Sequence, residues 1–361
     1  MWPYVLLILI PLLVQYIRLS RTTIKLAIND QKKNRNAMIV FWVLSFGLLA
    51  LRHDTVGIDL KTYDYIFHYI DKSSWQVGLT RSYEWVYSLL NKIIALFTDD
   101  FRWVIVVVAV ISVLFVAIAY TKYSTDTMFT IALFIVTPNF ILQFSGLRQA
   151  IAISLGFVAF EFVRKRKIGA FCLIVILAMM FHTSAFMLFF LYPLYYVKIT
   201  RKWLLWVVPS MIVVFVFNKQ IFGFLSLISS FTKYDFSIKS TGAYTMIIVY
   251  TLFAVFSYLV PEESELDADT FAMRNYLLMA VVLQMFAPLH SLAMRMNYYY
   301  IAFIPLLMPR IVYHRSKRWS QVAILGQYVM AVFFIIYFFI TVPQENVLNT
   351  FPYHFFWENV S

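Results

Sequence analysis

Charged residues and cysteine are both scarce in this sequence of 361 residues. Only 13% of the residues are charged and 62% are apolar, whereas a soluble domain is roughly 25% charged and roughly 45–50% apolar. Water cannot solvate that much apolar surface, so we infer that lipid is the solvent of this chain. Cys172 is the single cysteine, which excludes an intramolecular disulfide and a cysteine-based metal site.

Signatures of soluble nucleotide- and metal-dependent enzymes are also missing. The sequence has no Gly-rich phosphate loop, no HxxxH or HExxH pattern and no DxD-like metal pair in a soluble domain. We therefore expect no cofactor and no bound metal. The net charge of +12 is spread over short basic clusters between apolar runs. That distribution is typical of membrane topology, so we expect no nucleic-acid partner.

Long apolar runs occupy most of the chain. About twelve are candidates for transmembrane helices, although several fall short of the roughly 20 residues that cross the hydrocarbon. They lie near 2–18, 37–51, 101–120, 127–143, 147–163, 168–181, 184–198, 203–218, 243–260, 274–290, 297–313 and 320–341. The first has no basic n-region and no cleavage site, so we expect it to be retained. The sequence predicts an all-α, polytopic integral membrane protein with about 12 transmembrane helices in a single domain, residues 1–361.

Basic clusters in the short loops predict the orientation of these helices. Four clusters fall on one side if there are twelve spans: 18–35, 164–167, 198–202 and 315–318. Lys and Arg favour the cytoplasmic side, so both termini are predicted to lie outside. The acidic loop Pro261–Asp269 would be a solvated cytoplasmic loop. The segment 52–100 is then external, and the aromatic, apolar stretch 83–97 predicts a helix lying in the membrane interface.

Three charged or titratable side chains lie at the predicted outer edge of spans. A charge at the bilayer centre costs roughly 2.5–3.5 kcal/mol, so such residues are usually paired, snorkelling or functional. Arg148, next to Gly146, is either a snorkelling arginine or a guanidinium that grips phosphate. His182 is either a satisfied interfacial group or a proton-transfer residue. Arg295 precedes aromatic residues that suit either a membrane belt or a sugar-binding surface.

Carboxylates near a span end are concentrated in the external segment. Asp54 and Asp59 follow Arg52 closely, and Asp64 and Glu84 lie further along. A carboxylate here is either an ion partner of an arginine or a base that deprotonates a sugar hydroxyl. Glu161, in contrast, precedes the basic turn 164–167, and we interpret it as a structural ion partner of that turn. Three outer arginines on separate spans suit one polyanion, such as a lipid diphosphate.

Four short motifs occur in a characteristic order along the chain. They are Arg52…Gly57-x-Asp59…Tyr63, Leu147-Arg148-Gln149-Ala150-Ile151-Ala152, Phe181-His182-Thr183-Ser184-Ala185 and Arg295-x-x-x-Tyr299-Tyr300. Together they resemble the EpsG-like branch of the Wzy polysaccharide polymerases, from the second expected span to the penultimate one. Ile58 departs from that pattern, because the family tends to have a small hydroxyl residue there. This puts any role for a hydroxyl at that position in doubt.

The resemblance implies an all-helical, GT-C-like membrane glycosyltransferase of the bacterial plasma (inner) membrane. Such polymerases join undecaprenyl-diphosphate-linked oligosaccharide repeat units on the outer leaflet, with the lipid diphosphate as leaving group, during O-antigen, capsule or exopolysaccharide synthesis. They are taken to need no nucleotide sugar. Besides this substrate and the lipid bilayer, the candidate partners are a chain-length regulator and a flippase.

The candidate site residues follow from these motifs and from the polar residues at the outer edge. Those expected to bind the diphosphate or the glycan are Arg52, Tyr63, Glu84, Arg148, Gln149, Arg295 and Tyr299. Arg148 and Arg295 would stabilise the leaving diphosphate. The candidate bases are Asp54, Asp59 and His182, and the sequence does not choose among them.

Other functional classes remain open at this point. A flippase or transporter of lipid-linked oligosaccharides should carry ionisable residues in the middle of its spans, whereas the charges here cluster at one membrane edge. A membrane glycan acyltransferase would use a histidine base, but its acyl donor usually arrives from the cytoplasm. A ligand-binding membrane protein without catalysis is the third alternative.

Overall fold

The computed structural model describes residues 2–21, 34–80, 83–228 and 241–360. These residues are mostly helical and contain no strand, and their isolated β-bridges are Arg52–Phe355 and Pro261–Arg315. The prediction of an all-helical protein is confirmed for this part of the chain. The basic cluster predicted at 18–35 lies largely outside the described residues. The GT-C-like fold stays a prediction.

The chain divides into two compact units, which we describe separately. The first unit consists of 1–186 and 327–361, and the second of 187–326. The expectation of a single integral membrane domain stays a prediction.

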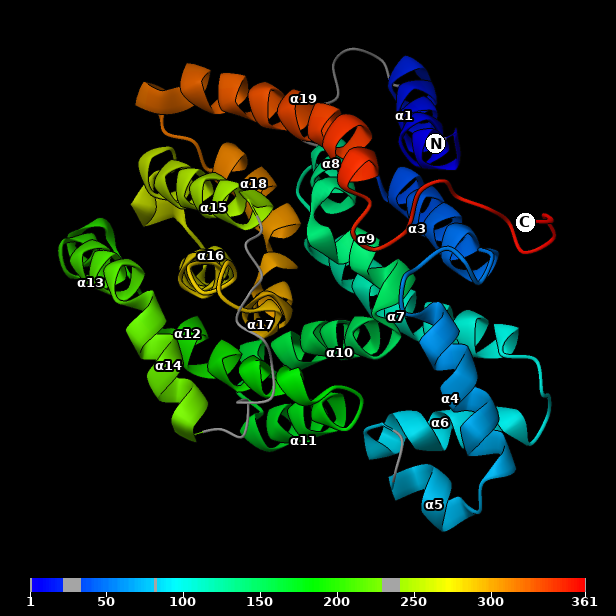
Figure 1. Cartoon of the computed structure of the whole chain (residues 1–361). Helices are drawn as coiled ribbons and strands as arrows, with labels where there is room; N and C mark the ends of the chain where they lie inside the picture. The colour runs from blue at the N-terminus through cyan, green and yellow to red at the C-terminus, as the bar shows by residue number, and fades with distance from the viewer. Residues whose placement is uncertain (1, 22–33, 81–82, 229–240, 361) are drawn as a thin grey trace. The chain divides into compact units, whose positions relative to one another are not determined.

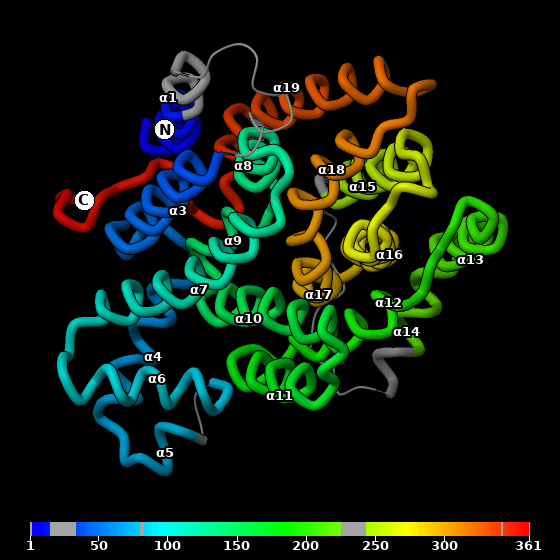
Figure 2. Tube along the Cα trace, turned by 180° about the vertical axis from the view of Figure 1, so that it is seen from behind, coloured from blue at the N-terminus to red at the C-terminus, as the bar shows by residue number. Residues whose placement is uncertain are grey.

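The helices of the first unit surround a core built on three of them. The unit contains α1 (Trp2–Arg21), α3 (Arg35–Ala50), α4 (Leu60–Lys72), α5 (Trp75–Thr80), α6 (Trp85–Ala95), α7 (Arg102–Tyr123), α8 (Thr127–Val136), α9 (Pro138–Ser145), α10 (Leu147–Arg164), α11 (Ile168–Met179), the start of the 3₁₀ helix η1 (Thr183–Phe190) and most of α19 (Ser320–Glu345). Helix α7 packs against α3 and α10, and α10 also packs against α11. Figures 1 and 2 show α4, α5 and α6 grouped together within this unit.

The basic residues Arg35, Lys122 and Arg164 of the first unit gather at one end of its core helices. Arg164, the last residue of α10, donates to the Tyr123 hydroxyl at the end of α7 over 2.7 Å, so α7 and α10 run in the same direction. Glu161 pairs with Arg164 and with Lys122, which confirms its structural role. Trp42 of α3 packs on Tyr120 of α7, and Arg35 at the start of α3 lines the same pocket as Lys122, so α3 begins near this end and runs the opposite way.

The opposite end of the same helices carries a different set of polar residues. Arg102 is the first residue of α7, Arg148 the second residue of α10, and Arg52 follows the end of α3. A helix of 22 residues such as α7 is about 33 Å long. The two ends of this helical core are therefore separated by about the thickness of a bilayer.

The segment between α3 and α7 folds into three helices. The helix expected at 83–97 is confirmed as α6, while α4 and α5 were not predicted. Lys92 of α6 is buried, and its Nζ donates to the backbone oxygens of Ile70, Asp71 and Ser73, each over 2.8 Å. A cation at this position satisfies carbonyls that a helix leaves unpaired at its C-terminus. Lys92 therefore fixes α4 against α6.

The loop between α3 and α4 is held from two sides. The C-terminal tail receives hydrogen bonds from the backbone nitrogens of His53, Gly57 and Ile58. Gly57 has a φ of +126°, and a Cβ there would lie 2.1 Å from the backbone oxygen of Phe144. Only glycine permits this backbone conformation and this approach to α9. The close packing places Asp59 next to the end of α9.

Apolar helices of several lengths are present. Within the described residues, α7 and Lys317–Glu345 are long and apolar enough to cross a membrane. Two bent pairs, Thr127–Val136 with Pro138–Ser145 (56°) and Thr183–Tyr196 with Arg201–Val216, raise this number to as many as four if each is one span. Pro138 accounts for the first bend, because proline begins a helix well but cannot continue one. The finding supports a membrane protein, and the count of twelve stays a prediction.

The second unit is built around α16. It contains α12 (Leu191–Tyr196), η2 (Arg201–Trp203), α13 (Leu204–Val216), α14 (Asn218–Ile228), α15 (Thr241–Leu259), η4 (Glu263–Glu265), α16 (Ala268–Gln284), α17 (Ser291–Ile301), α18 (Ile304–Tyr313) and η5 (Lys317–Trp319). Helices α12, α15, α17 and α18 all pack on α16. Helix α13 is strongly apolar, yet none of its residues is buried. Such a surface is suited to contact with lipid.

Candidate functional site

Arg148 lies at the centre of a polar cluster in the first unit. Its Nη1 forms an ion pair with the Glu84 carboxylate, its Nε donates to the Tyr63 hydroxyl over 3.4 Å, and its guanidinium lies 3.8 Å from the centre of the Tyr83 ring. The side chain is still 16% exposed. The guanidinium of Arg148, which α10 carries, is therefore held in a fixed orientation by α4 and by the residues just before α6, without being buried.

Glu84 connects Arg148 to the segment that carries His182. Its Oε1 accepts hydrogen bonds from the backbone nitrogen (3.0 Å) and the hydroxyl (3.1 Å) of Thr183, and it lies 3.5 Å from His182 Nδ1. Burial raises the pKa of Glu84, but the contact with His182, the positive charge of Arg148 and the Thr183 amide outweigh it. The pKa is therefore held well below its usual range, so the carboxylate is charged at neutral pH.

Asp59 approaches the same cluster from the loop before α4. Its Oδ2 accepts a hydrogen bond from the Ser145 hydroxyl over 2.8 Å. Burial is the main reason that the pKa of Tyr83 is raised to about 12, and the charge of Asp59 adds to it. The structure thus brings together five predicted site residues, and we call this group the Arg148 cluster: Asp59, Tyr63, Glu84, Arg148 and His182.

Arg52 and Asp54 lie apart from these contacts. Arg52 is 2% exposed, and its guanidinium lies 5.6 Å from the Phe144 ring centre and donates to the backbone oxygen of Leu49. Asp54 is exposed and pairs with its neighbour His53, with 2.7 Å between Oδ1 and Nδ1. Their roles in substrate binding and catalysis stay predictions, and the geometry separates them from the Arg148 cluster.

The remaining predicted residues are buried in α10 or belong to the second unit. Gln149 is buried in the first turn of α10. In α17, Arg295 is exposed and Tyr299 is buried. The expectation that Arg295 shares a diphosphate with Arg148 stays a prediction.

Three residues that sequence reasoning missed complete the Arg148 cluster: Tyr83, Ser145 and Thr183. Each is adjacent to, or three residues away from, a residue that was singled out. Tyr83 and Thr183 directly neighbour Glu84 and His182, so their proximity to the site was visible in the sequence. Ser145 precedes Gly146 and Arg148, but its contact with Asp59 joins residues 86 positions apart, which no local pattern indicates.

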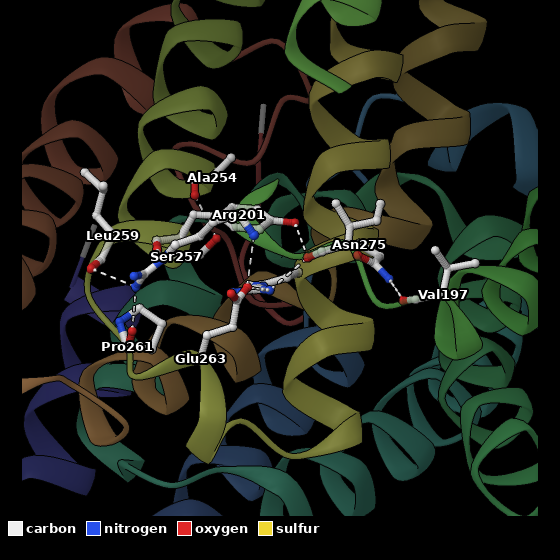
Figure 3. Close-up of polar contacts among 11 residues, drawn as sticks. Val197, Arg201, Ala254, Ser257, Leu259, Pro261, Glu263 and Asn275 are labelled. Atoms are coloured by element: carbon white, nitrogen blue, oxygen red, sulfur yellow. Dashed lines mark hydrogen bonds and ion pairs between the residues drawn. The ribbon is translucent and has the colours of Figure 1, made fainter. Parts of the chain in front are cut away.

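A second polar cluster lies in the second unit, around the acidic loop 261–269. Glu263 accepts from Arg274 Nη2 (3.1 Å) and from the Arg201 backbone nitrogen (3.2 Å). Figure 3 shows Arg201 extended toward Leu259 and Pro261, whose backbone oxygens accept from its Nη2. The loop is therefore fixed by ion pairs and hydrogen bonds, although most of its residues are exposed; its position on the cytoplasmic side stays a prediction.

Arg274 itself is completely buried. Its guanidinium lies 4.0 Å from the Tyr258 ring centre and 4.7 Å from that of Phe271, and its Nη2 also donates to the backbone oxygen of Ile199 over 3.0 Å. Because the side chain is 0% exposed, no substrate reaches it in this arrangement. We interpret this second cluster as structural. Among the described residues, no group of three or more His, Cys, Asp or Glu side chains is arranged to hold a metal.

The fold and the polar cluster at one end of its core helices define the general class, which is an all-helical, membrane-embedded protein. The model of the EpsG family matches residues 35–355, and the chain belongs to that family. This membership, which confirms the resemblance found in the sequence, indicates a polysaccharide polymerase-like membrane protein of the glycosyltransferase type. Neither the curated proteins nor the solved structures include one that is significantly similar to this chain.

Proposed function

We propose that the protein is a polysaccharide polymerase that joins undecaprenyl-diphosphate-linked oligosaccharide repeat units on the outer leaflet of the bacterial plasma membrane. The observation that carries the proposal is the fixed, partly exposed guanidinium of Arg148. It is oriented by Glu84, Tyr63 and Tyr83, so it is preorganised toward a ligand that comes from its open side. Preorganised cations of this kind stabilise charge that develops on a leaving group.

The leaving group in this reaction is the lipid diphosphate. The bond between the anomeric carbon of the donor glycan and the diphosphate oxygen breaks, and negative charge accumulates on that oxygen. An arginine fork can form two parallel hydrogen bonds to phosphate oxygens. Arg148 supplies this charge compensation, and Arg295 is the second candidate for the same role.

The acceptor hydroxyl must lose its proton as its oxygen forms the new bond to the anomeric carbon. His182 and Asp59 are the candidate bases in the cluster. Glu84 lies 3.5 Å from Nδ1 of His182, and a carboxylate that orients an imidazole base is a recurrent catalytic arrangement, but both ring nitrogens are buried, whereas Asp59 is exposed. The hydroxyl proton moves to the base and then to solvent. Asp59, which accepts from Ser145, is placed to bind a glycan hydroxyl.

The direction of the core helices supports action on the outer leaflet. The Arg148 cluster lies at the start of α10, whereas Arg35, Lys122 and Arg164 gather at the other end of the core helices. Basic residues accumulate on the cytoplasmic side. The cluster then faces outward, where lipid-linked repeat units meet after they have been flipped.

Polymerisation of lipid-linked repeat units by the purified protein in proteoliposomes tests this function. Arg148→Ala should lower the rate of polymer formation by about 10²–10³-fold, which is the size of effect seen when a preorganised charge-stabilising donor is lost. Arg35→Ala is the matched control, because Arg35 is exposed at the opposite end of the core helices, and it should polymerise normally. Full-length polymer from Arg148→Ala protein would overturn the proposal.

A second measurement separates the polymerase from a flippase. Cells without the protein should accumulate single repeat units on lipid in the outer leaflet. Accumulation in the inner leaflet would show instead that the protein moves the lipid across the membrane.

A further inference from the structure

A polar pocket lies next to the Arg148 cluster but is lined by other residues. Its volume is about 350 Å³, which is room for roughly ten water molecules at about 30 Å³ each. The lining residues come from the loop after α3, from α4, from the start of α7 and from the C-terminal tail. They are Arg52, His53, Asp54, Asp64, His68, Asp99, Asp100, Phe101, Arg102, Ile105 and Phe356.

Arg52 is the buried cation of this pocket. Arg52 lines the pocket, is 2% exposed, and its Nε and Nη2 have no hydrogen-bond partner among the residues that the structure describes. A buried donor without an acceptor costs about 1–3 kcal/mol, and more for a charged group. The buried guanidinium adds positive charge to the wall of the pocket, and the other lining side chains are the groups that a ligand can reach.

The charge of the pocket disfavours a polyanion as its ligand. Four aspartates and two arginines line it, and these six side chains carry a net charge of 2 − 4 = −2. A diphosphate would be repelled, which distinguishes this pocket from the surroundings of Arg148. Carboxylates accept hydrogen bonds from hydroxyl groups, and guanidinium groups donate to hydroxyl and ring oxygens. The lining therefore matches a neutral or amino-bearing polyhydroxylated molecule.

An aromatic side chain from the tail completes this lining. Phe356 lies beneath the guanidinium of Arg102 and is 42% exposed, and its backbone nitrogen donates to Leu51 over 3.0 Å. Aromatic rings pack against the apolar faces of sugar rings, while the surrounding polar groups bind the hydroxyls. The tail is thus anchored where it can cover a bound sugar.

We propose that this pocket is a subsite for a sugar residue of the glycan chain, separate from the diphosphate site at Arg148. The inference rests on the proposed polymerase function. Asp64 and His68 lie on α4, the helix that also carries Tyr63, which contacts Arg148. In this proposal, a glycan whose reacting end lies at Arg148 passes around α4 into the pocket, because adjacent residues of a helix point to different faces. The subsite then positions the glycan chain relative to the reacting centre.

Binding of a lipid-free oligosaccharide to the full-length protein tests the subsite directly. The probe is the repeat-unit oligosaccharide released from its lipid by mild acid, and titration calorimetry in nanodiscs measures its dissociation constant. Asp64→Asn and Phe356→Ala should each weaken binding by about tenfold, the effect of losing one hydrogen bond to a charged group or one ring contact. Asp71→Asn, on the same helix but outside the pocket, should bind like the wild type.

The outcomes distinguish this proposal from the proposed function. Arg148→Ala should abolish polymer while leaving oligosaccharide binding within twofold of the wild type. The subsite is refuted if the wild type does not bind the oligosaccharide, or if the pocket variants bind it normally. It is also refuted if Ca²⁺ or Mg²⁺ alone binds in an Asp64-dependent manner and the oligosaccharide does not. Normal polymerisation by Arg148→Ala protein, in contrast, would overturn the polymerase mechanism whatever the binding data show.

Discussion

The Arg148–Glu84 pair of the first unit and the Arg274–Glu263 pair of the second differ in what surrounds the arginine. Arg274 in the second unit is 0% exposed and is enclosed by Glu263, two aromatic rings and a backbone oxygen. Arg148 in the first unit has a comparable carboxylate and comparable rings, but its side chain is 16% exposed. The same residue types thus form a closed structural contact in one place and an open site in the other.

The difference between the two pairs lies in their neighbours. The second pair is closed off by backbone carbonyls and the acidic loop, which leave no room for a ligand. The first pair is surrounded by side chains with their own chemistry, namely His182, Asp59 and Tyr63. Buried ion pairs are weak evidence for function by themselves. Exposure of the cation and the presence of other titratable groups distinguish the Arg148 pair, which we propose to be the functional one.

Replacement of each arginine by methionine should separate the two roles most clearly. Arg274→Met removes a fully buried guanidinium and its bonds to Glu263 and Ile199; breaking a buried pair costs about 3–5 kcal/mol, and because Glu263 is 26% exposed we expect a loss at the low end of that range. Arg148→Met should cost less than half as much, because Glu84 keeps its contacts with Thr183 and His182. Thermal unfolding in detergent measures both. Equal destabilisation by the two variants would place Arg148 in the structural class with Arg274.

Substitution of Gly57 should show that the Arg148 cluster depends on the loop before α4. Gly57→Ala puts a Cβ 2.1 Å from the Phe144 backbone oxygen at a φ of +126°, so we expect a loss of about 2–3 kcal/mol in stability. Displacement of Asp59 should also lower polymerase activity. Gly47→Ala in α3 is the control, because nothing lies within 4 Å of its Cβ position and alanine favours helix. A neutral Gly57→Ala variant would contradict the close packing of this loop.

Sequence patterns selected the residues of the Arg148 cluster but not the contacts that support them. Arg148, His182, Asp59, Tyr63 and Glu84 were all selected, because a charged group at the edge of an apolar run is conspicuous. Their supports were not, since the Lys92 contacts with α4 and the Ser145–Asp59 bond join residues about 20 and 86 positions apart. Contacts over such separations leave no local periodicity in the sequence.

Helix boundaries in the apolar runs were predicted less well. The run 127–143 is two helices bent by 56° at Pro138, and 297–313 is divided between α17 and α18. Composition identifies a segment as apolar but does not show where it bends, because neighbouring helices decide whether a break is tolerated. The contacts of Glu263 in the acidic loop with Arg201 and Arg274 were likewise not indicated by composition.

Removal of the Lys92 charge should weaken the packing of α4 against α6, which supports the Arg148 cluster, without changing any residue of the cluster. Lys92→Met loses three hydrogen bonds of 2.8 Å to the end of α4, with an expected cost of about 1–2 kcal/mol. The polymerisation rate should fall moderately, because α4 carries Tyr63 and α6 follows Glu84. Lys165→Met, at the exposed turn after α10, is the control and should change neither property. An unchanged rate for Lys92→Met would show that the cluster does not need this contact.

Acidification should produce the smallest effect and should involve Glu84. Because the pKa of Glu84 is lowered in the folded protein, its charge contributes stability that is fully present above its unfolded pKa of about 4.3 and is lost as pH falls below that value. Melting temperatures at pH 6 and pH 3 should therefore differ more for the wild type than for Glu84→Gln, by the equivalent of about 1 kcal/mol. The variant removes the titrating group, so its curve lacks this component. If both proteins lose the same stability, the charge of Glu84 is not what holds Arg148 and Thr183 together, and the contrast with the closed Arg274 pair must rest on exposure alone.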